Sequence, residues 1–281
     1  MIKLDNVSFS YPNSCSSALN KVNLTLEEGS FVAILGANGS GKSTFAKLLN
    51  AILAPTSGSV IIDGLNTLDK AKIYDIRSKV GLVFQNPDTQ IICDTVEDEL
   101  AFGLENMGLR LEEMHRRIDH CLELTGLRAL KNINPQRLSG GQKQLVCLAS
   151  VLVMQPKYLV LDEATSMLDP SGRKLVLDFV KKLHQELGLA VLMITHNLEE
   201  CLEADKVVVL DKGRVKFEGT LKTLLATPEL VSNNSLSLPL ITQLSERLIA
   251  KGVQLPHGIL TVDEFCQAYS AVQHQREGSH A

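Results

Sequence analysis

Short, uninterrupted hydrophobic runs recur along most of the chain, with longer helical stretches between them. Four of these runs read SFVAILG, KVGLVFQ, KYLVLDE and LAVLMITH. Runs that are continuous rather than alternating are typical of strands buried on both faces, as in a parallel sheet. The first run leads through a glycine-rich loop into a helical stretch, FAKLLNAIL. This order of strand, loop and helix predicts an α/β fold built around a parallel core sheet.

Other stretches depart from this pattern. IKLDNVSF alternates, IIDG reads as a short strand, and VVVLDKGRVKFEG reads as a hairpin that turns at Lys212 and Gly213. These segments predict an antiparallel β portion beside the parallel sheet. A later stretch is charged and helical, and we interpret it as part of a helical subdomain, about residues 86–157, inserted into a main domain of residues 1–227.

The chain continues beyond this domain with a different texture. A polar linker, SNNSLSLP, precedes a helical stretch near Ile241 to Lys251. A second helix opens with Thr261 and Glu264, which have the spacing of a capping box. We therefore expect a small C-terminal helical extension over residues 228–273 and a disordered tail over residues 274–281.

Composition limits the possible functions. The 281 residues carry a net charge of -4, so there is no basic excess to neutralise nucleic-acid phosphates. Aromatic residues make up 4% and tryptophan is absent, which argues against a stacking platform for single strands. The longest apolar run, Leu145 to Met154, is about half as long as a membrane span requires, and we find no signal peptide. Any work at a membrane is therefore expected from the cytoplasm, through a partner.

The cysteines and two of the histidines give no sign of a metal site. No pair of cysteines has C-x-x-C spacing, which favours buried, reduced thiols over zinc or disulfides. The cysteines are Cys15, Cys93, Cys121, Cys147, Cys201 and Cys266. His115 and His120 lie among charged residues on an expected solvated face, so we give them no catalytic role.

The segment GANGSGKST fits the phosphate-loop pattern G-x-x-x-x-G-K-[ST]. Glycine lets backbone N–H groups turn toward phosphate oxygens without a Cβ in the way. Lys42 would reach the β- and γ-phosphates of ATP, and Ser43 would offer its hydroxyl to Mg²⁺. The predicted nucleotide-binding residues here are Gly36, Asn38, Gly39, Ser40, Gly41, Lys42, Ser43 and Thr44.

Polar side chains end three other hydrophobic runs. Asp162 and Glu163 end one of them, and alone they would read as two solvated acids. Beside a phosphate loop they suggest a Mg²⁺ ligand in Asp162 and a residue that orients or deprotonates water in Glu163. His196 and Gln85 end two more runs, although a lone histidine at a strand end is more often structural. Because parallel strands direct their carboxyl ends to one ligand-binding edge, we expect His196 near the γ-phosphate and Gln85 near Mg²⁺ or water.

A second candidate phosphate loop is RLSGGQKQLVCLAS. A hydroxyl and two glycines come directly before an apolar helix. Free N–H groups and the helix dipole would favour an anion there. The residues alone do not explain why one chain carries two such loops.

Together these segments resemble the ATP-binding cassette (ABC) ATPases over roughly residues 1 to 225. GANGSGKST is similar to the Walker A motif, LVLDEA to the Walker B motif and LSGGQ to the family signature. The resemblance implies the P-loop NTPase fold of ABC ATPases, with ATP and Mg²⁺ as ligands. It implies that Glu163, His196 and Gln85 take catalytic positions. The implied Mg²⁺ residues are Ser43, Gln85 and Asp162.

The resemblance also implies a dimer. In this family the signature of one subunit closes over the ATP of its partner, so the second loop would serve the facing subunit's nucleotide. The signature residues are Ser139, Gly140, Gly141 and Gln142. Asp169, in SMLD, takes the D-loop position, and Tyr11, in SYP, takes the position of the aromatic residue that stacks on adenine.

VFQNPDTQIICDTVEDELAFGLEN and DEATSMLDPSGR resemble more narrowly the first-paralogue ATPase of energy-coupling factor (ECF) importers. This implies that ATP hydrolysis energises uptake of a vitamin or transition-metal ion, with the protein peripheral on the cytoplasmic face of the cell membrane. The implied partners are a second ABC ATPase (paralogue or self), a transmembrane scaffold protein and a membrane substrate-binding protein, with no nucleic acid. The C-terminal extension would make subunit contacts. Leu145 stands at a position, just after Gln144, where many cassettes carry a basic residue.

Five polar residues after Gln85 admit two interpretations. In the resembled family, a groove at this place receives helices of the membrane scaffold that end in arginines. Carboxylates in the groove would form charge-assisted pairs with these arginines. The same acids could instead stabilise the start of the helix at TVEDEL. The residues are Asp88, Gln90, Glu97, Asp98 and Glu99.

Other functions within the family fit the sequence less well. A soluble ABC ATPase acting in DNA repair or translation is the alternative, but the chain has neither a long heptad insertion nor a second Walker A motif. A degenerate subunit is not favoured because Glu163 and His196 are both present. An exporter half-subunit would usually carry fused membrane spans. The sequence leaves the cargo open, and either a homodimer or a heterodimer.

Overall fold

The computed structural model describes residues 1–281 except 15, 228–229, 232–235, 237 and 279–281. Its larger sheet has six strands in the order β10-β9-β3-β8-β7-β6. The strands are β3 (Phe31–Leu35), β6 (Val80–Val83), β7 (Tyr158–Asp162), β8 (Ala190–Thr195), β9 (Lys206–Asp211) and β10 (Arg214–Gly219). Neighbours from β9 to β6 run parallel, and β10 pairs antiparallel with β9. The predicted parallel sheet and terminal hairpin are confirmed.

A second sheet is antiparallel and has four strands in the order β2-β1-β4-β5. Its strands are β1 (Ile2–Phe9), β2 (Leu19–Leu26), β4 (Ser57–Ile62) and β5 (Leu65–Asn66). One hydrophobic core joins its inner face to α1 (Lys42–Leu49) and to the parallel sheet, through residues such as Val22, Phe45 and Val160. The helix α2 (Ile73–Lys79) adds Ile76 to this core. The predicted antiparallel portion is confirmed.

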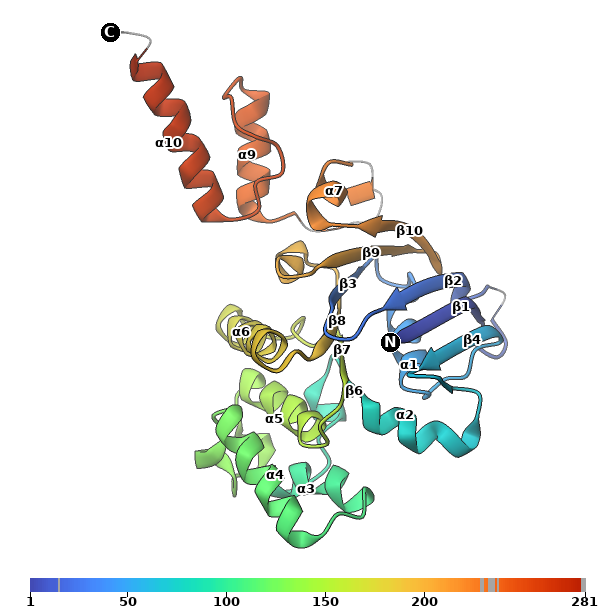
Figure 1. Cartoon of the computed structure of the whole chain (residues 1–281). Coiled ribbons are helices and arrows are strands. Elements are labelled where there is room, and N and C mark those ends of the chain that lie inside the picture. Colours follow the sequence, from blue (N-terminus) through green and yellow to red (C-terminus); the bar gives the residue numbers. More distant parts are fainter. Residues whose placement is uncertain (15, 228–229, 232–235, 237, 279–281) are drawn as a thin grey trace.

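Helices cover the other face of the parallel sheet. α5 (Gly140–Leu152) packs between α6 (Pro170–Leu187) and a lobe formed with α3 (Val96–Asn106) and α4 (Leu111–Leu124), at the lower part of Figure 1. Leu145, at the position where many cassettes carry a basic residue, is buried in the core of this lobe. Short 3₁₀ helices are η1 (Lys70–Lys72), η2 (Pro87–Thr89), η3 (Arg128–Leu130), η4 (Pro135–Arg137) and η5 (Leu198–Cys201).

The C-terminal part contains α7 (Leu221–Leu225), α9 (Leu240–Ala250) and α10 (Val262–Gly278), of which the last two project from the body (Figure 1). The predicted capping box is confirmed, because the Glu264 N–H donates to Thr261 Oγ1 over 3.1 Å and Glu264 Oε2 accepts from the Thr261 N–H over 3.3 Å. α10 extends to Gly278, into the segment expected to be disordered. The last three residues of the chain and part of the predicted linker lie outside the described residues.

Of the five cysteines that the structure describes, three are buried, Cys93 is half-buried and Cys266 is exposed. Burial raises the pKa of Cys121 and of Cys147 to about 12, and Cys201 is buried as well. Cys266 is exposed, because it lies on the projecting α10, so the expectation of a buried thiol is wrong there. Cys15 lies outside the described residues.

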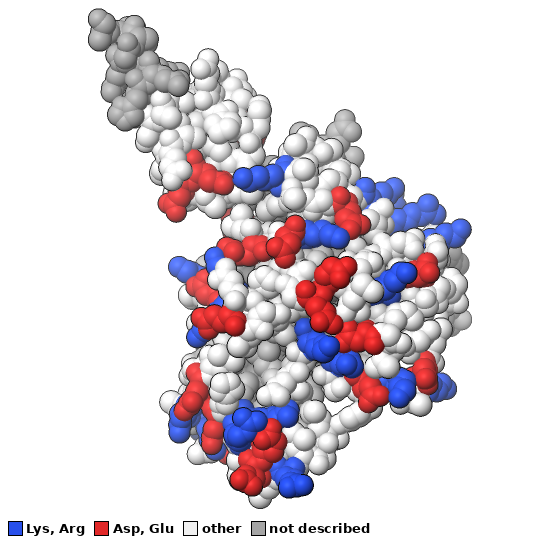
Figure 2. Space-filling view, in the orientation of Figure 1, with Lys and Arg blue, Asp and Glu red and all other residues white. Residues whose placement is uncertain are grey.

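Neither the described helices nor the face drawn in Figure 2 shows a membrane span or a surface of one charge sign. Among the residues that the structure describes, no helix has the length and apolar character needed to cross a membrane. Figure 2 shows Lys and Arg side chains interspersed with Asp and Glu over the face it presents. That face therefore offers no continuous basic surface to a polyanion.

Candidate nucleotide site

The phosphate loop lies between β3 and α1, where two glycines permit close backbone contacts. Gly36 has φ +155°, and a Cβ there would lie 2.3 Å from the carbonyl oxygen of Leu210. Gly41 has φ +107°, and a Cβ there would lie 2.5 Å from the carbonyl oxygen of Ala18. Neighbouring backbone therefore excludes any larger residue at either position, as the motif predicts.

Lys42 is buried at the start of α1, with its ammonium group inside the loop. Its Nζ donates to the carbonyl oxygens of Gly36 over 2.9 Å and Ala37 over 3.1 Å. It also pairs with Glu163 Oε1 at 3.2 Å. A buried ammonium group needs such partners. An incoming phosphate would compete with Glu163 for Lys42.

Ser43 and Asp162 form a second pair. The Ser43 hydroxyl donates to Asp162 Oδ1 over 3.0 Å. Burial raises the pKa of the Asp162 carboxyl above its ordinary value, and the bond from Ser43 opposes part of that shift. Hydroxyl and carboxylate oxygens are ligands that Mg²⁺ accepts, and a cation here would stabilise the ionised carboxylate. The side chains present therefore fit a magnesium ion.

Glu163 begins the turn after β7 in a backbone conformation that few glutamates adopt. Its φ is +50°, in the left-handed region, and its N–H donates to the carbonyl oxygen of Ile194 in β8 over 3.0 Å. The side chain lies between Lys42 and His196, whose Nδ1 is 3.8 Å from Glu163 Oε2. The structure thus brings Glu163 and His196 together, as the convergence of parallel strand ends predicts.

A pocket of about 390 Å³ joins the phosphate loop to other segments. Tyr11 lies at its rim, 42% exposed, with its hydroxyl 3.1 Å from Thr44 Oγ1. Gln85 also lines the pocket, whereas His196 lines a neighbouring cavity. The pocket lining is Tyr11, Ala18, Asn38, Gly39, Gly41, Lys42, Ser43, Thr44, Gln85 and Glu163. Asp162 lies behind this lining, where Ser43 contacts it.

The second phosphate loop lies apart from this pocket. Ser139 caps α5, since its hydroxyl accepts from the Gln142 N–H over 3.3 Å while Gln142 Oε1 accepts from the Ser139 N–H over 3.0 Å. Gly140 is exposed, but Gly141 is buried, and a Cβ there would lie 2.9 Å from Gly172 Cα in α6. The second glycine therefore has a packing role that the sequence did not reveal. None of the four signature residues lines the pocket beside Lys42.

Ser166 is a site residue that the sequence did not predict. Its Oγ accepts from Gln85 Nε2 over 3.0 Å and lies 2.8 Å from the Glu163 carbonyl oxygen, to which it donates. It therefore links two predicted catalytic residues. Asp169, further along the same turn, is exposed and caps α6, and the hydrogen bond from the Ser171 hydroxyl lowers the pKa of its carboxyl. In the sequence, only its place three residues after Glu163, in the DEATSMLD segment, could have pointed to Ser166 as a site residue.

Gly213 is a second residue that the sequence did not connect with the site. It lies at the β9–β10 turn, where its N–H donates to the Ser40 carbonyl oxygen over 2.9 Å. Its own carbonyl oxygen accepts from the Asn20 N–H in β2 over 2.8 Å. A hairpin glycine gives no indication of such a contact. The turn therefore joins the antiparallel sheet to the phosphate loop.

The polar residues just after Gln85 have partners inside the chain. Asp88 Oδ1 accepts from Lys143 Nζ over 2.6 Å. Gln90 Oε1 accepts from the Phe84 N–H over 2.9 Å. These bonds hold the loop after β6 against itself and against the first turn of α5. Asp88 and Gln90 therefore both have partners within the chain, although the Asp88 side chain is 54% exposed.

The acids at the start of α3 support the helix-start interpretation. Glu97 pairs with Lys131 at 3.0 Å, and Asp98 Oδ2 accepts from the Thr95 hydroxyl over 2.6 Å. Glu99 is 5% exposed and accepts from two backbone N–H groups of the preceding loop. These contacts favour the helix-start interpretation, and the docking interpretation stays a prediction. Glu99 also lines a groove between α2 and α3, which has a volume of about 590 Å³.

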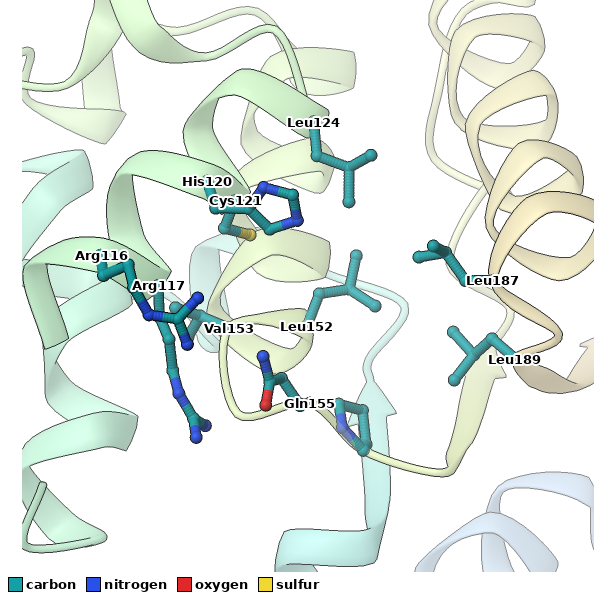
Figure 3. A pocket seen from close by; sticks show the side chains of 11 residues that line it. Arg116, Arg117, His120, Cys121, Leu124, Leu152, Val153, Gln155, Leu187 and Leu189 are labelled. Atoms are coloured by element: carbon teal, nitrogen blue, oxygen red, sulfur yellow. The ribbon is translucent and has the colours of Figure 1, made fainter. Parts of the chain in front are cut away.

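A separate pocket of about 270 Å³ lies in the helical lobe, and Figure 3 shows it between α4, α5 and the end of α6. Arg116 and Arg117 reach its edge, but both pair with Glu113. His120 lies beside them and, like His115, is exposed, as the sequence predicted. Among the described residues, no cluster of three or more His, Cys, Asp or Glu side chains could hold a metal ion. Nothing here connects this pocket with the phosphate loop.

Comparisons with known proteins agree with this geometry. A family model described as ABC transporter matches residues 19–166. The chain is 44% identical over 266 residues to the energy-coupling factor transporter ATP-binding protein EcfA1 of Clostridioides difficile (strain 630), covering 94% of this chain and 96% of that protein. The relative is therefore matched over nearly its whole length.

Two solved structures are similar in fold as well as in sequence. cbiO1 from Clostridium perfringens, described as part of the ABC transporter complex cbiONQ, gives a TM-score of 0.75 at 36% identity, covering 87% of this chain and 98% of that chain. The ATP-binding cassette MJ0796, in a dimeric post-hydrolysis state bound to ADP and Pi, gives 0.70 at 33% identity, covering 79% and 99%. The phosphate loop, its acidic partners and these matches together show that the chain belongs to the ABC transporter family, alongside the energy-coupling factor transporter ATP-binding proteins.

Proposed function

We propose that the chain is the ATP-binding and ATP-hydrolysing subunit of an energy-coupling factor importer. It energises uptake of a vitamin or a transition-metal ion from the cytoplasmic face of the membrane, to which it attaches through partners. The observation that carries the proposal is the grouping of Lys42, Glu163 and the Ser43–Asp162 pair around one pocket. The match to EcfA1 over nearly the whole chain supports the importer assignment.

The phosphate loop supplies the binding energy for the nucleotide. Its backbone N–H groups surround the phosphates at the start of α1, where the helix dipole also favours an anion. Lys42 exchanges its contact with Glu163 for one with the β- and γ-phosphates. Tyr11, exposed at the pocket rim, presents its ring to the adenine.

Ser43 and Asp162 would hold the magnesium ion, with Gln85 as a further oxygen ligand from the pocket wall. When bound, the ion neutralises charge that develops on the phosphates. The chain's own contribution is to keep Asp162 buried and oriented by the Ser43 hydroxyl. The oxygen donors of these three side chains support this assignment.

Glu163 is the residue that orients and deprotonates the attacking water. Its left-handed backbone and its bond to β8 fix the carboxylate at the pocket wall. Displacement from Lys42 by ATP leaves this carboxylate free to accept a proton. His196 Nδ1 lies 3.8 Å from Glu163 Oε2, and we expect this histidine to approach the γ-phosphate.

The second phosphate loop contacts the ATP of a partner subunit. Ser139 and Gly140 are exposed at the start of α5, where N–H groups have no intrahelical acceptor. Gly141 and Gln142 complete that turn, and Asp169 lies on the facing turn before α6. The partner is a second cassette, either a paralogue or another copy of this chain. The dimeric state of MJ0796 with ADP and Pi supports this arrangement.

The membrane scaffold protein docks in the groove between α2 and α3. Tyr74 and Phe102, which are 52% and 47% exposed, line this groove together with Met107 and Met154. Exposed aromatic and methionine side chains suit the apolar face of an incoming helix. The buried Glu99 offers one negative charge at the groove wall. A separate membrane substrate-binding protein holds the cargo.

Glu163→Gln tests the enzymatic part of this proposal. The amide keeps the shape of the side chain but cannot take a proton, so we expect hydrolysis to slow by about 100-fold or more. ATP binding should persist, because the phosphate loop is unchanged. Turnover and nucleotide affinity are measured on the purified protein. Glu186→Gln, an exposed glutamate on α6, is the matched control. Near-normal turnover of Glu163→Gln would show that another residue activates the water.

A further inference from the structure

A buried glutamate outside the pocket connects the turns that carry Glu163 and His196. Glu200 lies in η5, shortly after His196, and is 5% exposed. Its Oε1 accepts from the Thr165 hydroxyl over 2.6 Å. Thr165 is 1% exposed and lies in the turn that begins at Glu163. The bond therefore joins the turn after β7 to the turn after β8.

The same carboxylate faces the helix that follows Asp169. Arg173 lies in the first turn of α6, and its Nε is 3.8 Å from Glu200 Oε1. This is an ion pair that is longer than a hydrogen bond. A buried, incompletely paired charge contributes little stability, because desolvation offsets the attraction. Stability alone therefore gives no reason to keep a glutamate here.

Unpaired polar atoms gather around this contact. Glu200 Oε2, Arg173 Nε and His196 Nδ1 are buried and have no hydrogen-bond partner among the described residues. All three residues line one cavity of about 270 Å³. Buried polar atoms without partners cost free energy, so their grouping beside His196 calls for a functional reason.

The η5 turn fixes how Glu200 and His196 lie relative to each other. Thr195 Oγ1, directly before His196, accepts from the Asn197 N–H over 3.0 Å. The Glu200 N–H donates to the Asn197 carbonyl oxygen over 3.3 Å. The backbone of Glu200 is therefore linked to that of His196 through a short, hydrogen-bonded segment.

We propose that Glu200 is a positioning residue that sets the contact between His196 and Glu163 by holding their two turns together. It acts on ATP hydrolysis through these residues and does not touch the nucleotide. The inference rests on the proposed function. A misplacement of about 1 Å at a reacting group can cost roughly 100-fold in rate, so a link between the turns affects turnover more than affinity.

Glu200→Gln keeps the size of the side chain but weakens the bond from the Thr165 hydroxyl, because a neutral amide oxygen accepts less strongly than a carboxylate. It also removes the charge that faces Arg173. We expect kcat for ATP hydrolysis to fall about tenfold or more, while KM and the Kd for ATP change by less than about threefold. Glu199→Gln, the exposed neighbour on the same turn, is the matched control and should leave all three values unchanged. Equal behaviour of the two variants would overturn the proposal.

Thr165 provides an independent pair of variants, in case Glu200→Gln lowers folding stability. Thr165→Val removes the hydroxyl at nearly constant volume and should reproduce the loss of kcat. Thr165→Ser keeps the hydroxyl and should restore kcat to near the wild-type value. Thermal unfolding of each variant is measured alongside the kinetics. Losses of kcat that follow Tm rather than the presence of the hydroxyl would contradict a positioning role.

A double-mutant cycle with His196 separates positioning from a structural effect. If Glu200 acts through His196, then Glu200→Gln should cost less than about twofold in a His196→Ala background. If the double variant instead loses kcat by the product of the two single-variant losses, the proposal is overturned. If the proposed function itself is wrong, the single variants His196→Ala and Glu163→Gln will keep near-normal turnover. This outcome can be told apart from failure of the positioning role.

Discussion

Asp162 is the residue at which burial and charge conflict most clearly. It is 5% exposed at the end of β7, burial raises its pKa, and the hydrogen bond from Ser43 offsets only part of that effect. As pH rises, the unfolded chain loses this proton before the folded chain does. The contribution of Asp162 therefore becomes more destabilising between the unfolded and the folded pKa, and it stays constant above the folded pKa.

Asp162→Asn is expected to raise the thermal stability of the nucleotide-free protein by a few degrees at neutral pH. Asparagine keeps an oxygen that accepts from Ser43 but carries no charge. The gain should shrink as pH falls toward the ordinary range of aspartate, near about 4. Calorimetry without nucleotide or Mg²⁺ measures this, and a gain that is the same at every pH would contradict it. Mg²⁺ with ATP should stabilise the wild type more than the variant.

Single residues of the site could be predicted where a local pattern encodes them. Lys42 and Ser43 follow from a fixed spacing, and Glu163 follows from its place at a strand end. Ser43 and Asp162, which are 119 residues apart, were expected together only because both were assigned to Mg²⁺. The partner of Gln85, Ser166, is 81 residues away and was not predicted. Such contacts depend on tertiary packing, which no short pattern records.

At the scale of elements, the contact between α5 and α6 depends on two glycines. Gly141 and Gly172 bring the two helix backbones together, and a Cβ on Gly141 would lie 2.9 Å from Gly172 Cα. The preceding glycine, Gly140, is exposed, and its Cβ would lie 3.4 Å from a flexible leucine side chain. Gly141 is therefore required by helix packing, whereas packing does not require a glycine at Gly140.

Gly141→Ala should lower the free energy of unfolding by about 1–3 kcal/mol, because the added methyl group overpacks the α5–α6 contact. Gly140→Ala should change it by less than about 1 kcal/mol, since alanine costs less entropy in a helix than glycine and its Cβ would meet the leucine at an ordinary contact distance. Urea unfolding of both variants measures the difference. Equal midpoints would show that α6 moves aside at little cost.

The elements themselves were largely predictable from hydrophobic pattern. β3, β6, β7 and β8 are buried along their whole length, which is why their runs are continuous in the sequence. The pattern was less informative for α10, which extends past the boundary predicted for the C-terminal extension. The acids before and within α3 were also ambiguous, because acidic side chains both stabilise a helix start and would bind the arginines of a docking partner.

At the scale of the whole molecule, the groove between α2 and α3 is the surface that we assign to the scaffold protein. Phe102→Glu places a charge in this groove and should reduce co-purification of membrane partners at least about tenfold, because a buried unpaired charge is costly. ATP hydrolysis and Tm of the isolated chain should not change. Leu111→Glu, on an exposed leucine outside the groove, is the control. Equal recovery of partners with both variants would place the docking surface elsewhere.

The turn at Gly213 has a consequence for the order in which the protein is made. The phosphate loop is synthesised early, but its backbone lies against Leu210 and accepts a hydrogen bond from Gly213. A ribosome releases residues 36–44 long before it reaches that hairpin. The nascent chain therefore emerges with its nucleotide loop unsupported on one side. Competence to bind ATP is acquired near the end of translation of the main domain.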